Sequence, residues 1–162
     1  MNHTVLLLAL ALLSQLNAAA ASRLKALILT GEIDSRYHDW RASTAFLRDL
    51  LERTGRFDVR VEEEVAGISA ATLGPYDLLI LNYNGPRWGP AAERAVEQFV
   101  GQGKGLISFH GVTYGPLYGM VFEGNKWQAG HDQGWQAYAE LIGARWDAAK
   151  ICLLYTSDAA DE

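Results

Sequence analysis

The segment Gly103-Lys104-Gly105-Leu106-Ile107-Ser108-Phe109-His110-Gly111 decides the fold of this chain. Its short, glycine-bounded apolar run is typical of a central strand in a parallel sheet. In open parallel sheets, ligands bind in the crevice beyond the carboxyl ends of the strands. We therefore expect His110 at that edge. Gly111 follows it and allows the backbone to turn sharply and to approach a ligand closely.

Strand-like and helix-like segments alternate along the rest of the chain, with short links between them. This order predicts an α/β fold with a mostly parallel sheet and helices on both faces. One predicted helix buries an apolar stripe of four residues, Phe46, Leu47, Leu50 and Leu51. The predicted strands are Leu24–Thr30, Phe57–Val61, Tyr76–Leu81 and Leu106–Phe109, and the predicted helices are Ser43–Thr54, Pro90–Gly101 and Gln133–Ile142.

Polar and aromatic residues gather in the loops that leave the carboxyl ends of the predicted strands. These loops are Gly31–Trp40, Asn82–Trp88 and His110–Gly130, and they contain two of the four histidines, three of the five asparagines and three of the five tryptophans. The links at the opposite edge are plain turns, such as Gly101-Gln102-Gly103. This asymmetry predicts a functional site at the carboxyl edge of the sheet.

The first 21 residues have the pattern of a secretory signal peptide. An apolar run from Val5 to Leu16 precedes a small-residue cleavage site at Ala19 to Ala21. The run is short for a membrane span, and no cysteine follows it that could carry a lipid. We therefore expect a secreted or periplasmic protein without a stable membrane anchor.

The last eleven residues, 152–162, do not fit the pattern of the segment before them. They resemble the translation of a transposase adapter used in sequencing libraries, so we interpret them as foreign sequence that truncates the domain at its C-terminus. Removing Asp158, Asp161 and Glu162 from the net charge of −5 leaves about −2 for the rest. Such a charge does not suggest a nucleic-acid partner. The only cysteine lies in this tail, so residues 22–151 contain no disulfide.

Several motifs of residues 22–151 resemble those of the ThuA-like (trehalose utilisation) family. They are Tyr37-His38-Asp39-Trp40, the YDLLIL strand that ends at Leu81, Phe99-Val100, the GKGLISFHG segment, and a Trp135-x-x-Tyr138-x-x-x-Ile142-Gly143 element. The resemblance covers nearly all of Leu24 to Trp146. It implies a class I glutamine amidotransferase-like fold, which is a flavodoxin-like three-layer α/β/α sandwich, here incomplete at the C-terminus.

The resemblance also bears on the activity. True amidotransferases carry a cysteine in the turn after a central strand, where this chain has Phe109-His110-Gly111. Without a thiolate nucleophile, glutaminase chemistry is excluded. The family name implies disaccharide catabolism, with members thought to process keto-sugars. Family members continue past Trp146, so fused domains or a homo-oligomer remain open for the full-length protein.

Two histidines are the candidate catalytic residues. His110 at the strand edge is a candidate acid/base because imidazole titrates near neutral pH, and the alternative is that it fixes the turn. His38 is a second candidate, with helix capping as its alternative. The histidines lack the spacing of a helical zinc motif, so we predict no metal, although a site assembled from three loops stays open. No cofactor is predicted.

Flat aromatic rings and amides near the same edge suggest a carbohydrate ligand. Aromatic faces can stack on sugar rings, with core or lid packing as the alternative. Amides can bond sugar hydroxyls, with turn geometry as the alternative. The candidate binding residues are Trp40, Asn82, Asn84, Trp88, Gly111, Tyr114, His131 and Trp135.

These features lead to one functional hypothesis and two rivals. The chain is predicted to be a secreted domain that acts on or binds a keto-sugar or disaccharide, with His110 as acid/base. The first rival is a non-catalytic sugar-binding or interaction module of a larger secreted protein. The second is that the truncated product does not fold stably.

Overall fold

The computed structural model of the chain describes residues 22–32, 39–109, 112, 115–124 and 126–144. Four parallel strands form one sheet in the order β2-β1-β3-β4. They are β1 (Leu24–Glu32), β2 (Phe57–Glu62), β3 (Leu78–Asn84) and β4 (Gly105–Ser108). The helices are α2 (Trp40–Arg53), α3 (Ala70–Leu73), α4 (Pro90–Gly101) and α5 (Tyr138–Ile142), with short 3-10 turns η1 (Val65–Gly67) and η3 (Gly115–Tyr118).

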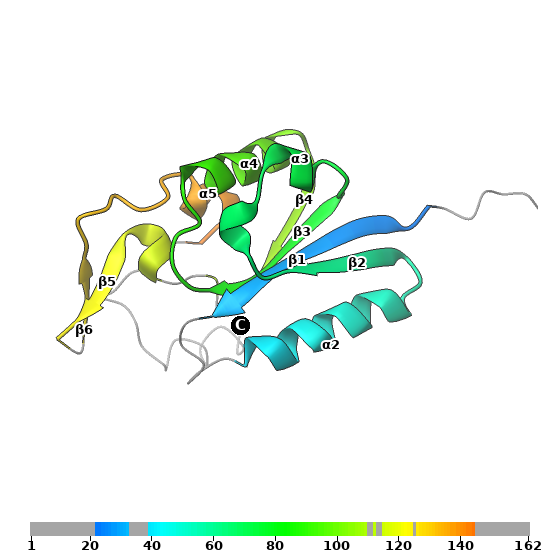
Figure 1. The fold of residues 1–162 in the computed structure, drawn as a ribbon, viewed down its shortest axis with the longest axis horizontal. Helices are drawn as coiled ribbons and strands as arrows, with labels where there is room; N and C mark the ends of the chain where they lie inside the picture. The colour runs from blue at the N-terminus through cyan, green and yellow to red at the C-terminus, as the bar shows by residue number, and fades with distance from the viewer. Residues whose placement is uncertain (1–21, 33–38, 110–111, 113–114, 125, 145–162) are drawn as a thin grey trace, which may run out of the picture.

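The elements form three layers. Helix α2 covers one face of the sheet, and α3 and α4 cover the other (Figure 1). The order β2-β1-β3-β4 is the first part of the flavodoxin-like order 2-1-3-4-5. The predicted α/β fold with a mostly parallel sheet and helices on both faces is therefore confirmed.

Each face of the sheet has its own core. Alternate residues of β1 point to opposite faces, so Leu27 and Leu29 join the larger core under α3 and α4, whereas Ala26 and Ile28 join the smaller core under α2. All four are buried. Burial on both faces explains why this strand shows no alternation of polar and apolar residues in the sequence.

Local signals fix the starts of the helices. The side chain of Asp39 accepts a hydrogen bond of 3.0 Å from the Ala42 amide, so α2 begins at Trp40, three residues earlier than predicted. Pro90 occupies the first turn of α4, as expected. Gly143 ends α5 in the left-handed conformation with φ 67°, which also agrees with its predicted role.

The predicted apolar stripe of α2 is only half right. Leu47 and Leu51 pack against the smaller core. Phe46 and Leu50 remain 64% and 50% exposed. The side of the helix that faces the sheet carries Thr44, Leu47 and Leu51. Phe46 and Leu50 each come one position before one of these leucines, so they turn away from the sheet.

Three boundaries differ from the sequence prediction. Strand β3 continues to Asn84, so Asn82 and Asn84 are strand residues and not loop residues. The segment predicted as an aromatic loop contains η3 and a hairpin of β5 (Met120–Glu123) and β6 (Lys126–Ala129). Helix α5 begins at Tyr138 and not at Gln133. Among the described residues, no helix is long and apolar enough to span a bilayer.

Candidate functional site

The carboxyl ends of β1 and β3 meet at the point where the chain changes direction across the sheet. From β1 the chain proceeds to β2 on one side, and from β3 it proceeds to β4 on the other. Ligands of doubly wound folds bind at such a switch point. The register pairs Thr30 with Asn82 and Glu32 with Asn84 at this edge, and the β5-β6 hairpin lies beyond it (Figure 1).

A closed ring of hydrogen bonds holds the start of α2 against these strand ends. The Asn82 Nδ2 atom donates to Thr44 Oγ1 at 2.9 Å, and Thr30 Oγ1 donates to the Asn82 carbonyl at 3.0 Å. The two threonine hydroxyls lie 2.7 Å apart, so Thr44 donates to Thr30 and the ring closes. Asn82 Nδ2 also reaches Ser43 Oγ at 2.9 Å. The Nδ2 group of this predicted sugar-binding residue therefore already has protein acceptors.

Asn84 differs from Asn82 in having an unused oxygen. Its side chain is only 8% exposed, and its Oδ1 atom has no hydrogen-bond partner. Because residues 82 and 84 are two apart on one strand, both side chains lie on the α2 face of the sheet. A buried acceptor without a donor is costly, so this position favours a ligand or water that can donate a hydrogen bond.

Tyr83 lies between the two asparagines and points to the other face. Its hydroxyl donates to the Pro86 carbonyl at 2.8 Å, and its ring meets Trp88 edge-on at 5.5 Å between centroids. Burial, and to a smaller extent the charge of Glu64, raises the pKa of Tyr83 to about 12. The phenol therefore stays protonated and fixes the loop after β3. Side chains alternate between the two faces along a strand, and this alternation is the sequence signal that places Tyr83 on the opposite face from Asn82 and Asn84.

The tryptophans predicted to stack on sugar are buried in protein contacts. Trp88 and Trp135 are 3% and 4% exposed and pack against each other at 5.4 Å between ring centroids. Trp135 also stacks on Tyr138 at 5.0 Å. Trp40 is 9% exposed, with the Arg41 guanidinium 4.1 Å from its ring centroid. These contacts favour the packing alternative for all three tryptophans.

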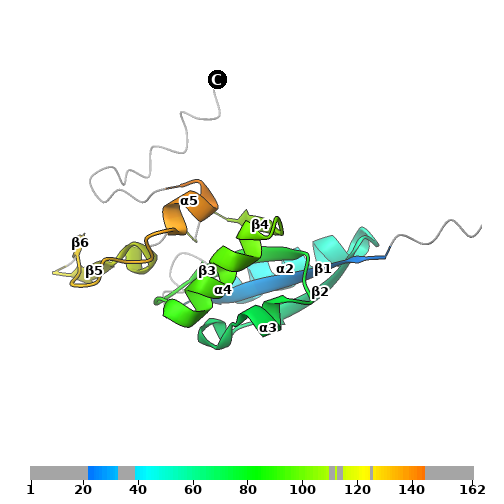
Figure 2. The same ribbon diagram turned by 90° about the horizontal axis from the view of Figure 1, so that it is seen from above.

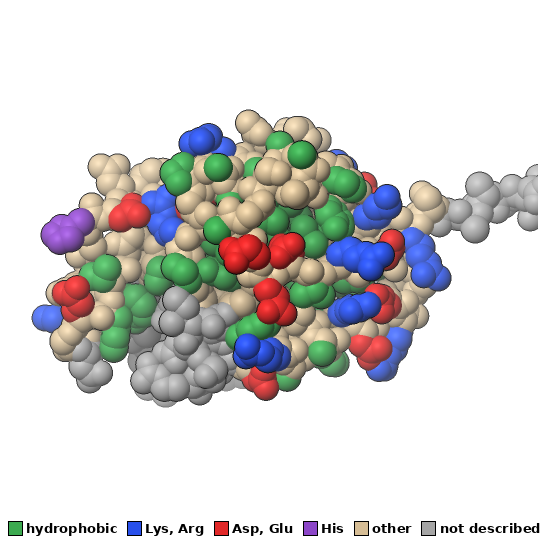
Figure 3. All heavy atoms as spheres, viewed as in Figure 1, with side chains coloured by type: hydrophobic (Ala, Val, Ile, Leu, Met, Phe, Trp, Pro, Cys, Tyr) green, Lys and Arg blue, Asp and Glu red, His purple; other side chains and the backbone are tan. Residues whose placement is uncertain are grey.

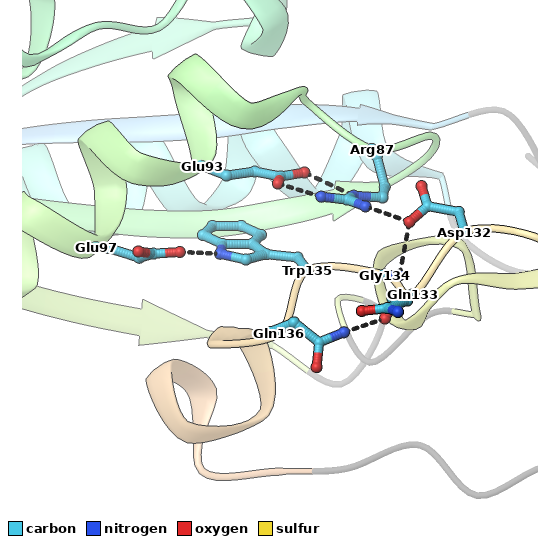
Figure 4. A network of polar contacts seen from close by, with 8 residues as sticks. All are labelled: Arg87, Glu93, Glu97, Asp132, Gln133, Gly134, Trp135 and Gln136. Atoms are coloured by element: carbon cyan, nitrogen blue, oxygen red, sulfur yellow. Dashed lines mark hydrogen bonds and ion pairs between the residues drawn. The ribbon is translucent and has the colours of Figure 1, made fainter.

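A network of ion pairs joins α4 to the segment that follows the hairpin (Figure 4). Arg87 binds both carboxylate oxygens of Glu93, whose side chain is 5% exposed, and donates to Asp132 at 2.6 Å. The hydrogen bond to Glu93, opposed by partial burial, raises the pKa of Arg87 above its usual range. The Gly134 amide, and then Arg87, lower the pKa of Asp132. Both shifts favour the charged forms of Arg87 and Asp132 and so support the ion pair between them.

Next to this network, Trp135 is fixed by its indole. The Trp135 Nε1 atom donates to Glu97 of α4 at 2.6 Å (Figure 4). The Trp135 amide donates to the Leu117 carbonyl at 2.8 Å. The segment thus connects α4 with η3, the turn that precedes the hairpin. The ion pairs and this indole together set the position of the hairpin beyond the strand ends.

A separate groove of about 460 Å³ runs along α2 beside the end of β2. Charged side chains of both signs line it, including Arg48, Asp49 and Glu52. Ion pairs along α2 join Arg48 to Glu52 and Arg53 to Asp49, and blue and red side chains alternate in this part of Figure 3. The electrostatic potential in the groove therefore has no single sign that would select a charged ligand.

The remaining predicted site residues divide into two groups. His38, His110, Gly111 and Tyr114 lie outside the described residues. His131 is exposed after β6, and because the helix predicted from Gln133 begins only at Tyr138, His131 does not lie at its amino end. In the described part of the chain, no group of three or more histidines, cysteines and carboxylates is placed to hold a metal ion.

Comparison with known proteins identifies the family. Residues 25–160 match the model of the family ThuA, described as trehalose utilisation. The chain belongs to the ThuA family. The description of the family is carbohydrate-related, and no curated protein matches the chain.

Two solved ThuA-like structures resemble this member. A ThuA-like protein from Bacteroides uniformis ATCC 8492 is 27% identical with a TM-score of 0.50, over 60% of this chain and 40% of its own. A ThuA-like protein from Parabacteroides merdae ATCC 43184 is 28% identical with a TM-score of 0.49, over 56% of this chain and 33% of its own. The chain therefore spans about a third to two fifths of the length of these relatives.

Proposed function

We propose that this ThuA-family chain binds a carbohydrate at the carboxyl ends of β1 and β3, and that His110 is the acid/base of a reaction on it. The observation that carries the binding proposal is the buried, unpaired Oδ1 atom of Asn84 at the switch point of the sheet. The ligand class follows from the chemistry of this atom and from the family description.

An amide oxygen accepts hydrogen bonds and cannot donate them. A sugar hydroxyl can supply the missing donor, which removes a desolvation cost of about 1–3 kcal/mol. At the strand ends Thr30 and Asn82 are neutral, and Glu32, the register partner of Asn84, is acidic. This set suits an uncharged ligand better than a phosphate or a carboxylate. The family description, trehalose utilisation, supports the same ligand class.

The catalytic part of the proposal rests on the position of His110 in the sequence. In the sequence it follows the last residue of β4 by two positions, and β4 pairs with β3, the strand that carries Asn84. Imidazole exchanges protons near neutral pH, which suits proton transfer next to the carbonyl of a keto-sugar. His38 would assist it, the aromatic segment after Gly111 would cover the ligand, and residues 1–21 would direct secretion.

Substitution of Asn84 by leucine tests the binding site. Asn84→Leu keeps the size of the side chain and removes its unpaired oxygen, so we expect unchanged or slightly higher thermal stability. Calorimetric titration with trehalose and with a keto-disaccharide should show at least about tenfold weaker binding, which is about 1.4 kcal/mol. Gln102→Leu on the exposed end of α4 is the matched control. Equal affinity of Asn84→Leu and the unchanged protein would refute the site.

Substitution of His110 by alanine in the full-length protein tests the acid/base. We expect turnover of the keto-disaccharide to fall by about 10²-fold or more, with thermal unfolding close to that of the unchanged protein. Unchanged turnover would exclude the catalytic role and leave the binding proposal intact.

The second candidate is a non-catalytic sugar-binding module. The side chains of Thr30, Asn82 and Asn84 favour it, because hydroxyl and amide groups bind sugar hydroxyls and are not acids or bases near neutral pH. Tight binding of a sugar that is recovered chemically unchanged after prolonged incubation would support this candidate over an enzyme.

A further inference from the structure

The β5-β6 hairpin has one aromatic face and one polar face. Its register pairs Phe122 with Trp127, and residues directly opposite each other on two strands point to the same face. The rings of this pair lie 5.2 Å apart between centroids and are inclined by 56°. On the opposite face, Gln128 donates a hydrogen bond of 2.7 Å to Glu123. The polar face therefore has a hydrogen bond within the hairpin, whereas Phe122 on the aromatic face remains 49% exposed.

The Trp127 ring is supported by the turn η3. Gly115 begins this turn, and a Cβ atom at this position would lie 2.6 Å from Cζ3 and 2.7 Å from Cε3 of the Trp127 ring. The indole therefore packs directly on the Gly115 backbone, and a residue with a side chain would displace the ring. Trp127 is partly buried, and Phe122 beside it is half exposed. The two rings thus form a surface with one supported ring and one ring open to solvent.

The base of the hairpin is fixed as well. The Gly130 amide donates to the Gly119 carbonyl at 2.9 Å, and a Cβ atom at Gly119 would lie 2.6 Å from the Gly134 amide nitrogen. The two chain segments at the base are therefore in backbone contact, and Arg87 from the loop after β3 binds Asp132 next to them. Figure 1 and Figure 2 both show the hairpin beyond the carboxyl ends of β1 and β3. The aromatic face is thus held at the same end of the sheet as the proposed carbohydrate site.

We propose that the aromatic face of the hairpin, made of Phe122 and Trp127, is a second contact site for carbohydrate, where one ring of a disaccharide stacks while the other ring is bound at Asn84. The class of ligand rests on the proposed function. One face of a pyranose ring carries several C–H groups, and the face of an aromatic ring has the negative charge density that attracts them. The hydroxyls at the rim of the stacked sugar ring stay in water, so this site needs no polar partner for them.

The small size of the aromatic face favours a sugar ring over a protein partner. A stable protein interface buries about 800 Å² on each side. A whole aromatic side chain offers roughly 150–250 Å², and here Trp127 is partly buried and Phe122 is half-buried. The residues at the tip of the hairpin, Glu123 and Lys126, are exposed and charged, so they do not extend the apolar surface. A second copy of the chain would need a larger apolar surface than these two rings provide, whereas a single sugar ring would not.

Substitution of Phe122 by alanine tests the second site, because it removes the exposed ring and leaves the strand pairing in place. Calorimetric titration with trehalose and with glucose compares a ligand of two rings with a ligand of one. We expect Phe122→Ala to bind trehalose at least about threefold more weakly, and to bind glucose within about twofold of the unchanged protein. Phe122→Trp keeps an aromatic face and should restore the affinity for trehalose. Val121→Ala, on the opposite face at a residue 37% exposed, is the matched control and should change neither affinity.

Three results would overturn this inference alone. The first is trehalose binding that Asn84→Leu weakens and Phe122→Ala does not. The second is an equal loss with Val121→Ala, and the third is a failure of Phe122→Trp to restore the affinity, because the loss would then not depend on an aromatic face. A loss with Phe122→Ala but not with Asn84→Leu would instead refute the Asn84 site and the two-site arrangement. Absence of sugar binding by the unchanged protein would overturn both proposals.

Discussion

Removal of Arg87 is expected to destabilise the fold more than removal of any exposed ion pair. Arg87→Met leaves the carboxylate of Glu93, with a side chain 5% exposed, without its two charge-assisted hydrogen bonds. Breaking a buried ion pair costs about 3–5 kcal/mol. The Arg87 side chain is 23% exposed, so water can partly replace it and we expect about 2–4 kcal/mol. For a domain of this size, the melting temperature should fall by roughly 6–12 °C.

Two further variants distinguish the cost of leaving a buried charge unpaired from the cost of losing side-chain contacts. Arg87→Met combined with Glu93→Met removes both charges and should recover most of the loss, to within about 1 kcal/mol of the unchanged protein. Arg53→Met breaks a pair whose side chains are 77% and 53% exposed, and should cost less than about 0.5 kcal/mol. Urea unfolding followed by tryptophan fluorescence measures all three. Equal costs for Arg87→Met and Arg53→Met, or no recovery in the double variant, would refute the reasoning.

Three other variants test neighbouring parts of the structure. Thr44→Val opens the hydroxyl ring at Asn82 and should cost about 1–3 kcal/mol in urea unfolding, whereas Thr44→Ser keeps the hydroxyl and should cost less. Gly119→Ala places a Cβ 2.3 Å from the Asp132 carbonyl oxygen at φ 76° and should cost about 2–5 kcal/mol, against about 1 kcal/mol for Gly103→Ala, where φ is also positive but no atom lies within 4 Å. Because the pKa of Asp132 is lowered in the fold, its contribution is present above about pH 3.9 and is lost as the pH falls through the folded pKa. Asp132→Asn should therefore show a smaller loss of stability on acidification, measured by urea midpoints between pH 6 and pH 2.5.

Elements with strong local signals were predictable from the sequence. The unbroken apolar run of β1 indicated a buried parallel strand, and β1 is buried at the centre of the sheet. The glycine-bounded run of β4 also lies in the sheet, but it is the last strand of the described order and not a central one, and Ile107 is 44% exposed. The hairpin of β5 and β6 was missed for a physical reason. Its strands have only four residues each, which is too short to show a clear alternation, and its ring contact between Phe122 and Trp127 at 5.2 Å joins cross-strand neighbours of the hairpin itself.

The candidate site shows the same division. The order of strands and loops was enough to predict which edge of the sheet carries the candidate site. The separate roles of Asn82 and Asn84 could not be predicted, because the two residues are of the same type and lie on the same strand and the same face of the sheet. Only the neighbours distinguish them: α2 supplies hydroxyl acceptors to Asn82, and no protein donor reaches the Oδ1 atom of Asn84.

The tryptophans explain why composition alone overstated the sugar-stacking surface. An aromatic residue in a predicted loop can face a ligand or anchor the loop to the core, and the sequence does not distinguish the two. Trp88 and Trp135 anchor their segments, one against Tyr83 and the other through Glu97 of α4. Buried aromatic anchors of this kind hold the loops against the core, and under the proposed function specificity then rests on polar groups such as the Asn84 amide. Binding at this edge should therefore respond to the number and placement of hydroxyl donors on the sugar more than to its apolar face.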